Sequence, residues 1–181
     1  IFPLPGAFEN ARPCSTYYGQ LSANKEADFK TPLPAFQGKT LPYAVCGYTG
    51  PQFRAAYEGN TTLTGAGVTV GIIDAYASPT IAADAQQYAI AHGDGGYAKG
   101  QFTQTVAAKP DQIKLCDASG WFGEETLDVE AVHAMAPGAK IHYYGAKNCV
   151  DGLLDSMAQA VDENSVSVIT NSYGDQGEQD E

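Results

Sequence analysis

The sequence predicts an α/β fold, a mostly parallel, doubly wound sheet with helices on both of its faces. Two observations lead to this prediction. Short apolar runs rich in β-branched residues alternate with segments whose apolar residues recur at helical spacing, and the first such run, residues 67–75 (GVTVGIIDA), is apolar along almost its whole length. Strands of this kind are buried on both faces, as in parallel sheets whose crossover connections are helices.

The domain organisation changes near residue 48. Residues 1–47 hold six of the ten prolines and have neither helical nor strand periodicity, so they are predicted to form an extended arm or linker. Residues 48–181 are predicted to form the N-terminal part of a compact domain. A short helix over residues 49–57 begins it, because Thr49 is a helix-capping residue type and Pro51 falls in the first turn, where no amide hydrogen is needed.

Helices and strands then alternate along the chain. Residues 79–92 repeat apolar side chains at helical spacing and stop before Gly93, a residue type favoured just past a helix end. A weaker strand is predicted at residues 101–107. A helix is predicted at residues 123–136, ended by Pro137.

The last predicted elements are a strand, a helix and a strand. They cover residues 140–145 (KIHYYG), 150–163 and 165–173 (SVSVITNSY), and an acidic tail, residues 175–181, follows. Ligands of such folds gather at the carboxyl ends of the parallel strands. Polar residues that end strands therefore become candidates for a site: Asp74 after the first strand and Asn171 to Gly174 after the last.

Charge and composition exclude several classes of function. Ten basic and 21 acidic residues give a net charge of −11, with a pI near 4.5, and 44% of the residues are hydrophobic. So acidic a chain, without a cluster of lysine or arginine, is not expected to bind nucleic acid or anionic membranes. No apolar stretch is long enough to span a bilayer. A dinucleotide-binding GxGxxG motif, a P-loop and a GxSxG elbow are all missing from the sequence.

The four cysteines indicate disulfides rather than zinc ligands, because they lack CxxC spacing with nearby histidines. Four cysteines allow three pairings, and sequence order favours Cys14 with Cys46 and Cys116 with Cys149. Disulfides imply an oxidising compartment, so the protein is expected to be secreted or otherwise extracytoplasmic. Asn60, in Asn-Thr-Thr, is a formal glycosylation site.

A pair of carboxylates is the strongest candidate for chemistry. Glu124 and Asp128 are four residues apart on the predicted helix and so share one face, with Ala131 and Met135 continuing their stripe. Like charges this close raise the proton affinity of one member, which suits a general base that works in acid. Such pairs also occur on solvated helix faces, so the pair alone does not decide between the two interpretations. The three histidines have no catalytic neighbour in the sequence and are expected to be structural.

Three segments together resemble the sedolisins, or serine-carboxyl peptidases. GVTVGIIDAY (67–76) resembles the family's first core strand, GEETLDVEAVHAMAPGAKI (123–141) resembles its Glu-x-x-x-Asp helix followed by Ala-Pro-Gly-Ala, and SVITNSYG (167–174) resembles its substrate-lining strand. The resemblance covers about residues 48–174. It implies a subtilisin-like fold in which a glutamate replaces the histidine as general base to a serine.

The resemblance assigns roles by position. Glu124 matches the general base and Asp128 the aspartate that orients it, in the manner of a serine protease triad. Asp74 matches a supporting acidic position, and Ser172, Tyr173 and Gly174 match the substrate-binding strand, with tyrosine in place of the family's tryptophan. Acid-active endopeptidase or tripeptidyl peptidase action on peptides or unfolded proteins follows from the resemblance.

The family's nucleophilic serine, its oxyanion-stabilising aspartate and its calcium site lie downstream of the part matched here, and neither Ser167 nor Ser172 fits the nucleophile motif. The chain alone is therefore expected to be inactive, as the N-terminal piece of a nicked enzyme whose second, C-terminal chain carries the serine and the calcium. Two alternatives stay open. They are a conventional subtilisin-like protease using Asp74 with a histidine base, and a noncatalytic secreted binding fragment.

Overall fold

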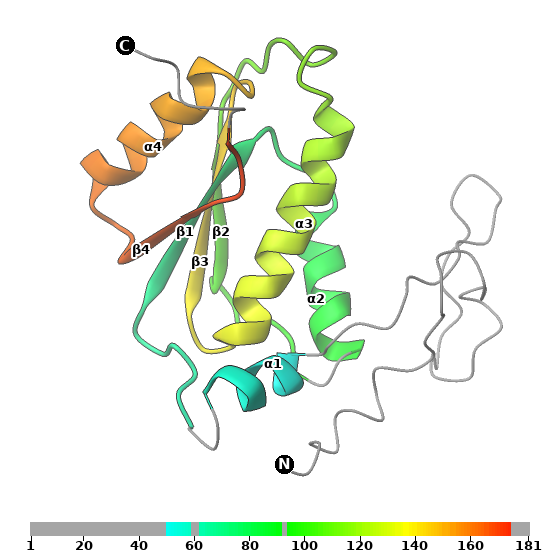
Figure 1. Ribbon diagram of the computed structural model, residues 1–181, viewed down its shortest axis with the longest axis vertical. Helices are drawn as coiled ribbons and strands as arrows, with labels where there is room; N and C mark the ends of the chain where they lie inside the picture. Colours follow the sequence, from blue (N-terminus) through cyan, green and yellow to red (C-terminus); the bar gives the residue numbers. More distant parts are fainter. Residues whose placement is uncertain (1–49, 59–61, 92–93, 175–181) are drawn as a thin grey trace, which may run out of the picture.

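The computed structural model describes residues 50–58, 62–91 and 94–174 and confirms the α/β prediction. Figure 1 shows a parallel sheet between helices. The elements in chain order are α1 (Gly50–Tyr57), β1 (Thr69–Ala75), α2 (Ile81–Ala91), β2 (Phe102–Val106), α3 (Ala118–Met135), β3 (Lys140–Ala146), α4 (Asp151–Glu163) and β4 (Val168–Asn171). None of the helices in these ranges combines the length and the apolar character that crossing a bilayer requires.

The described sheet has four parallel strands in the order β2-β3-β1-β4. The predicted buried strand, β1, lies between β3 and β4, which explains its near-continuous apolar sequence. Ile73 pairs with Tyr144 on one side and with Asn171 on the other. The polar residues that follow β4 therefore lie beside the end of β1, as expected for neighbouring parallel strands.

Helices cover both faces of the sheet, as predicted (Figure 1). Alternate residues of β1 belong to separate core clusters, because successive side chains of a strand point to opposite faces. Ile72 packs with Val129 of α3 and with residues of α2, whereas Ile73 packs with Leu153 and Ala160 of α4. The same alternation places Asp74, two residues after Ile72, on the face that α3 covers.

Two elements differ from the sequence prediction by three or more residues at one end. The long helix begins at Ala118 rather than near residue 123, because Trp121 and Phe122 pack against the apolar core and extend the helix over two glycines that disfavour it. The last strand is limited to Val168–Asn171, where the pairing with β1 begins and ends.

Several predictions concern residues outside the described ranges. These are the extended arm over residues 1–47, the Cys14–Cys46 disulfide, the glycosylation site at Asn60 and the acidic tail. The second predicted disulfide is confirmed, since Cys116 and Cys149 are bonded with their Cα atoms 5.5 Å apart.

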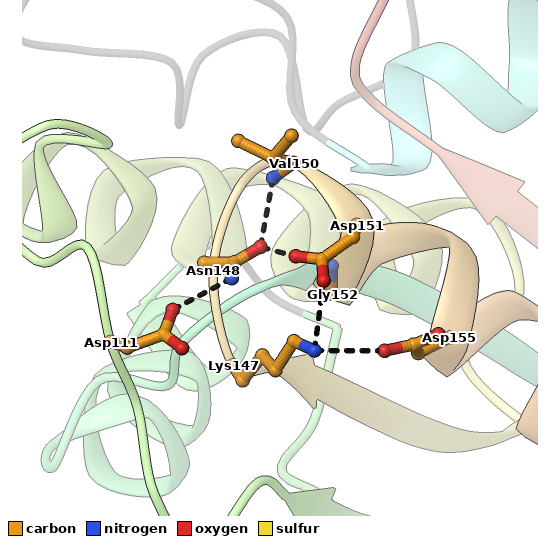
Figure 2. A network of polar contacts seen from close by, with 7 residues as sticks. All are labelled: Asp111, Lys147, Asn148, Val150, Asp151, Gly152 and Asp155. Atoms are coloured by element: carbon orange, nitrogen blue, oxygen red, sulfur yellow. Dashed lines mark hydrogen bonds and ion pairs between the residues drawn. The ribbon is translucent and has the colours of Figure 1, made fainter.

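A buried asparagine ties α4 to the loop before α3. The Asn148 side chain is 1% exposed; its Nδ2 donates to Asp111 Oδ1 at 2.7 Å, and its Oδ1 accepts the backbone N–H groups of Val150 (3.0 Å) and Gly152 (2.9 Å). Figure 2 shows this network, with Lys147 beside it paired to two aspartates of α4. The asparagine thus supplies the helix-capping acceptor that Val150, at the N-cap position, does not.

We expect Asn148→Ala to lower the free energy of unfolding by about 1 to 3 kcal/mol, because it leaves buried backbone donors and Asp111 without their partner. Thermal denaturation followed by circular dichroism measures this. Gln159→Ala on the exposed face of the same helix is the control and should change stability by less than about 0.5 kcal/mol. Equal effects of the two substitutions would contradict the capping role.

Candidate active site

The predicted site residues converge where β1 and β4 end beneath α3. Asp74, the penultimate residue of β1, is fully buried, and the alternation along the strand turns it toward α3. Asp128 of α3 is 7% exposed and accepts a hydrogen bond from the side chain of Ser172, just past the end of β4. Glu124, one helical turn before Asp128, is half-buried. Two elements distant in sequence, β1 and α3, thus supply one group of carboxyl side chains, and Ser172 after β4 supplies a hydroxyl to it.

Burial and mutual repulsion raise the pKa of each of these carboxyls. Burial raises the pKa of Asp74 to about 8, together with the charges of the nearby carboxylates, of which Asp128 contributes most. The pKa of Glu124 is raised by burial and then by Asp128, and burial raises the pKa of Asp128 against the opposing hydrogen bond from Ser172. Asp74, with a pKa near 8, keeps its proton in mild acid, and the raised proton affinity of Glu124 and Asp128 suits them to accepting protons there.

Several buried oxygens of this group have no hydrogen-bond partner among the described residues: both carboxylate oxygens of Asp74, Oδ2 of Asp128 and Oε1 of Glu125. The ion pairs in the same ranges lie elsewhere, between Arg54 and Asp94 and between Lys147 and two residues of α4. Buried carboxylates without cationic partners are costly when ionised, so the site favours shared protons over full ionisation.

Glu125 is a buried member of the site that sequence reasoning missed. The predicted stripe continued from Glu124 and Asp128 to Ala131, yet Ala131 is exposed. The most deeply buried positions of α3 are instead Glu125 and Val129, each fully buried and one helical turn apart. Burial raises the pKa of Glu125 to about 7, against a hydrogen bond from the backbone of Ser78. The signal in the sequence was the helical periodicity: Glu125 lies one turn before the apolar Val129, and so on the buried face of the helix.

The proposed substrate strand meets the same site. Ser172 and Gly174 are exposed, whereas Tyr173 is half-buried, with its ring centroid 6.5 Å from that of Trp121. The Tyr173 hydroxyl donates to Asn171 Oδ1 at 2.9 Å, and its pKa is raised by burial and by Asp74. Tyr173 thus lies beside Trp121 and within electrostatic range of Asp74.

The two described histidines have partners outside this group. His133 is buried, stacks on Tyr97 with ring centroids 3.9 Å apart, and lies 3.4 Å from the carbonyl oxygen of Gly95. His142 of β3 is hydrogen-bonded to the hydroxyls of Thr103 (2.8 Å) and Thr105 (3.0 Å). Burial lowers the pKa of both imidazoles. These contacts give them structural roles and do not support a histidine base working with Asp74.

Calcium has no ligand set in the described part of the chain. Within residues 50–58, 62–91 and 94–174, no three histidine, cysteine or acidic side chains are arranged to hold a metal ion. The resemblance assigns calcium to the C-terminal part of the family's domain and not to these carboxyls, so the described residues do not test it, and no step below depends on a metal.

Comparison with known proteins gives one distant relative. No protein-family model matches the chain. It is similar to kumamolisin from Bacillus sp. (strain MN-32), with 28% identity over 141 residues, which is 77% of this chain and 25% of that protein. The chain thus spans about a quarter of the length of the curated relative that it matches. This similarity confirms the resemblance to the sedolisin family, which includes kumamolisin.

The raised pKa values predict that the folded chain loses stability as pH rises. Asp74 (about 8, from 3.8) and Glu125 (about 7, from 4.5) keep protons in the folded state that the unfolded state has released, so their contribution is full below about pH 4 and is lost up to about pH 8. The lowered pKa values of the two histidines act in the opposite direction below about pH 6.5.

Calorimetric melting temperatures measured between about pH 5 and pH 8 test this expectation. Asp74→Asn should reduce the fall in melting temperature with rising pH, because the neutral amide has no proton to release. The same substitution at exposed Asp162 should leave that fall unchanged. A melting temperature of the native chain that rises over this range, or an identical slope in Asp74→Asn, would contradict the assignment.

Proposed function

Because the chain resembles the sedolisins in its motifs and in its match to kumamolisin, we propose that it is part of the catalytic domain of an acid-acting serine-carboxyl peptidase. In this proposal the domain comprises residues 48–181, and residues 1–47 precede it. The observation that supports this proposal best is the convergence of Asp74, Glu124 and Asp128 at the ends of two parallel strands.

Glu124 acts as the general base in this proposal. It is the most accessible of the three carboxyls, so it can reach a reacting group, and Asp128 lies within electrostatic range of it. Asp128 is itself held by the Ser172 side chain, which fixes the orienting residue relative to the end of β4. Serine peptidases use this arrangement, in which a third group orients the base that activates the nucleophile.

The chemistry follows acyl transfer. The serine hydroxyl attacks the peptide carbonyl, a C–O bond forms, and the hydroxyl proton passes to Glu124. The same carboxyl then gives this proton to the departing amine as the C–N bond breaks, and water releases the acyl group in the second half of the reaction. The serine and the oxyanion-stabilising aspartate are supplied by the C-terminal part of the same precursor, as a second chain.

A carboxylate base sets the working pH. A histidine is protonated well below its pKa of about 6.5, whereas a carboxyl still accepts a proton in acid. Asp74 supports the pair from behind, because its own proton limits the negative charge around Glu124 and Asp128. Secretion into an acidic, oxidising compartment agrees with the Cys116–Cys149 disulfide.

The substrate peptide lies along the segment that follows Asn171. β4 has only β1 as a neighbour among the described strands, and the exposed residues Ser172 and Gly174 extend from it. An added side chain at Gly174 would meet no atom within 4 Å, so the space beside its backbone is open. An extended peptide adding to this edge would bring its backbone past the carboxyls, as in other cases of strand addition.

We expect Glu124→Gln in the enzyme assembled with its C-terminal part to lower kcat for an unfolded protein substrate at about pH 4 by about 10²- to 10⁴-fold, because the amide cannot accept the serine proton. Glu163→Gln, at an exposed position of α4, is the matched control and should retain activity.

Native enzyme should cleave in acid and not at about pH 8, where a histidine base works. Full activity of Glu124→Gln, or activity confined to pH 8, would contradict the proposed base. An absence of cleavage at both pH values in the assembled protein would favour the noncatalytic binding fragment.

A further inference from the structure

The turn between β1 and α2 is held from two directions. Tyr76, two residues after Asp74, has a left-handed backbone with φ of 66° although it is not glycine. Its N–H donates to the carbonyl oxygen of Ala146 at 2.8 Å, and its own carbonyl oxygen accepts the hydroxyl of buried Tyr143 at 2.9 Å. A side chain at Gly145 would collide with that carbonyl. Close packing on β3 thus fixes one side of the turn.

The contact from the other side comes from α3. The backbone N–H of Ser78 donates to Oε2 of Glu125, across 47 residues of sequence, and both residues are buried. Ser78 follows Asp74 by only four residues. A displacement of the turn would therefore move the end of β1, and with it Asp74, relative to the helix that carries Glu124 and Asp128.

We propose that Glu125 is a positioning residue of this site: its carboxyl holds the turn at Ser78 against α3 and so keeps Asp74 in place behind the Glu124–Asp128 pair. The catalytic consequence rests on the proposed function, whereas the contact itself does not.

The carboxyl group of Glu125 also affects the ionisation of the site. Oε1 of Glu125 has no partner among the described residues, and the titratable groups that interact with Glu125 are acidic: Asp74 from β1 and Tyr143 from β3. Protonated, Glu125 keeps its carbonyl oxygen for Ser78 without adding charge. Ionised, it adds a negative charge that opposes ionisation of Asp74.

Two substitutions separate these effects. Glu125→Gln keeps an acceptor for Ser78 and removes the charge, whereas Glu125→Met keeps the volume and removes the acceptor. Glu130→Gln is the matched control, because Glu130 is a half-buried carboxyl of the same helix whose pKa burial also raises to about 7.

Hydrogen exchange of the Ser78 amide, measured on the full chain at about pH 5, tests the contact without any need for activity. Glu125→Met should speed exchange about tenfold, which is the loss of one net hydrogen bond, while Glu125→Gln and Glu130→Gln should match the native chain. Unchanged exchange in Glu125→Met would overturn the proposal.

Where Glu125→Met does not fold, the carboxyl carbon signal of Asp74, followed by NMR as pH is raised, decides. Asp74 should titrate at lower pH in Glu125→Gln, since a neighbouring negative charge is gone, and should not shift in Glu130→Gln. An unshifted Asp74 in Glu125→Gln would show that the two groups are not neighbours and would overturn the proposal.

The effect on catalysis is measured with the assembled enzyme at about pH 4. Glu125→Met should lower kcat about tenfold with little change in KM, and Glu125→Gln should restore it, because misplacement of Asp74 affects the chemical step rather than substrate binding. A Glu125→Met variant that is less stable but has native kcat would show a purely structural role and overturn the positioning proposal. If the native assembly lacks peptidase activity, the proposed function fails, while the exchange and titration results still decide the contact.

Discussion

The candidate site depends on one constraint, the burial of several carboxyl groups without cationic partners among the described residues. Asp74, Glu125 and Asp128 are nearly or completely inaccessible, and their oxygens are only partly hydrogen-bonded. Such a group is tolerated when it keeps protons, because a neutral carboxyl costs far less to bury than an ionised one. The acidic pH at which a carboxylate is suited to act as a base is therefore also the pH at which the fold is stabilised.

The scaffold makes this burial feasible by fixing the elements around it. β1 is covered on both faces and bonded on both edges, so Asp74 stands at the end of a strand that has little freedom to move. The Cys116–Cys149 disulfide and the Asn148 cap connect the loop before α3 to the start of α4. Because these links join elements on opposite faces of the sheet, they restrain the start of the helix that carries the other carboxyls.

Local sequence accounts for most of the fold. The β-branched run ending at Asp74 required a strand buried on both faces, and the helical periodicity before Gly93 required a covering helix. The start of α3 was not visible in the same way, since its first turns contain two glycines and become helical only through the packing of Trp121 and Phe122. The candidate pair Glu124 and Asp128 was recognised from its spacing and motif, whereas their shared position with Asp74 required the paired strands.

The sequence by itself predicted the alternation of elements, the candidate pair Glu124 and Asp128, and the resemblance to the sedolisins, because each depends on local spacing, residue type or chain order. Chain order also favoured the Cys116–Cys149 pairing, which the structure confirms. Only the tertiary structure decided which side chains are buried together. Glu125 follows Glu124 directly in the chain, yet helix geometry turns it toward the sheet and the turn at Ser78, 47 residues away, gives it a partner. Contacts of that range arise from strand order and helix placement, which no local pattern specifies.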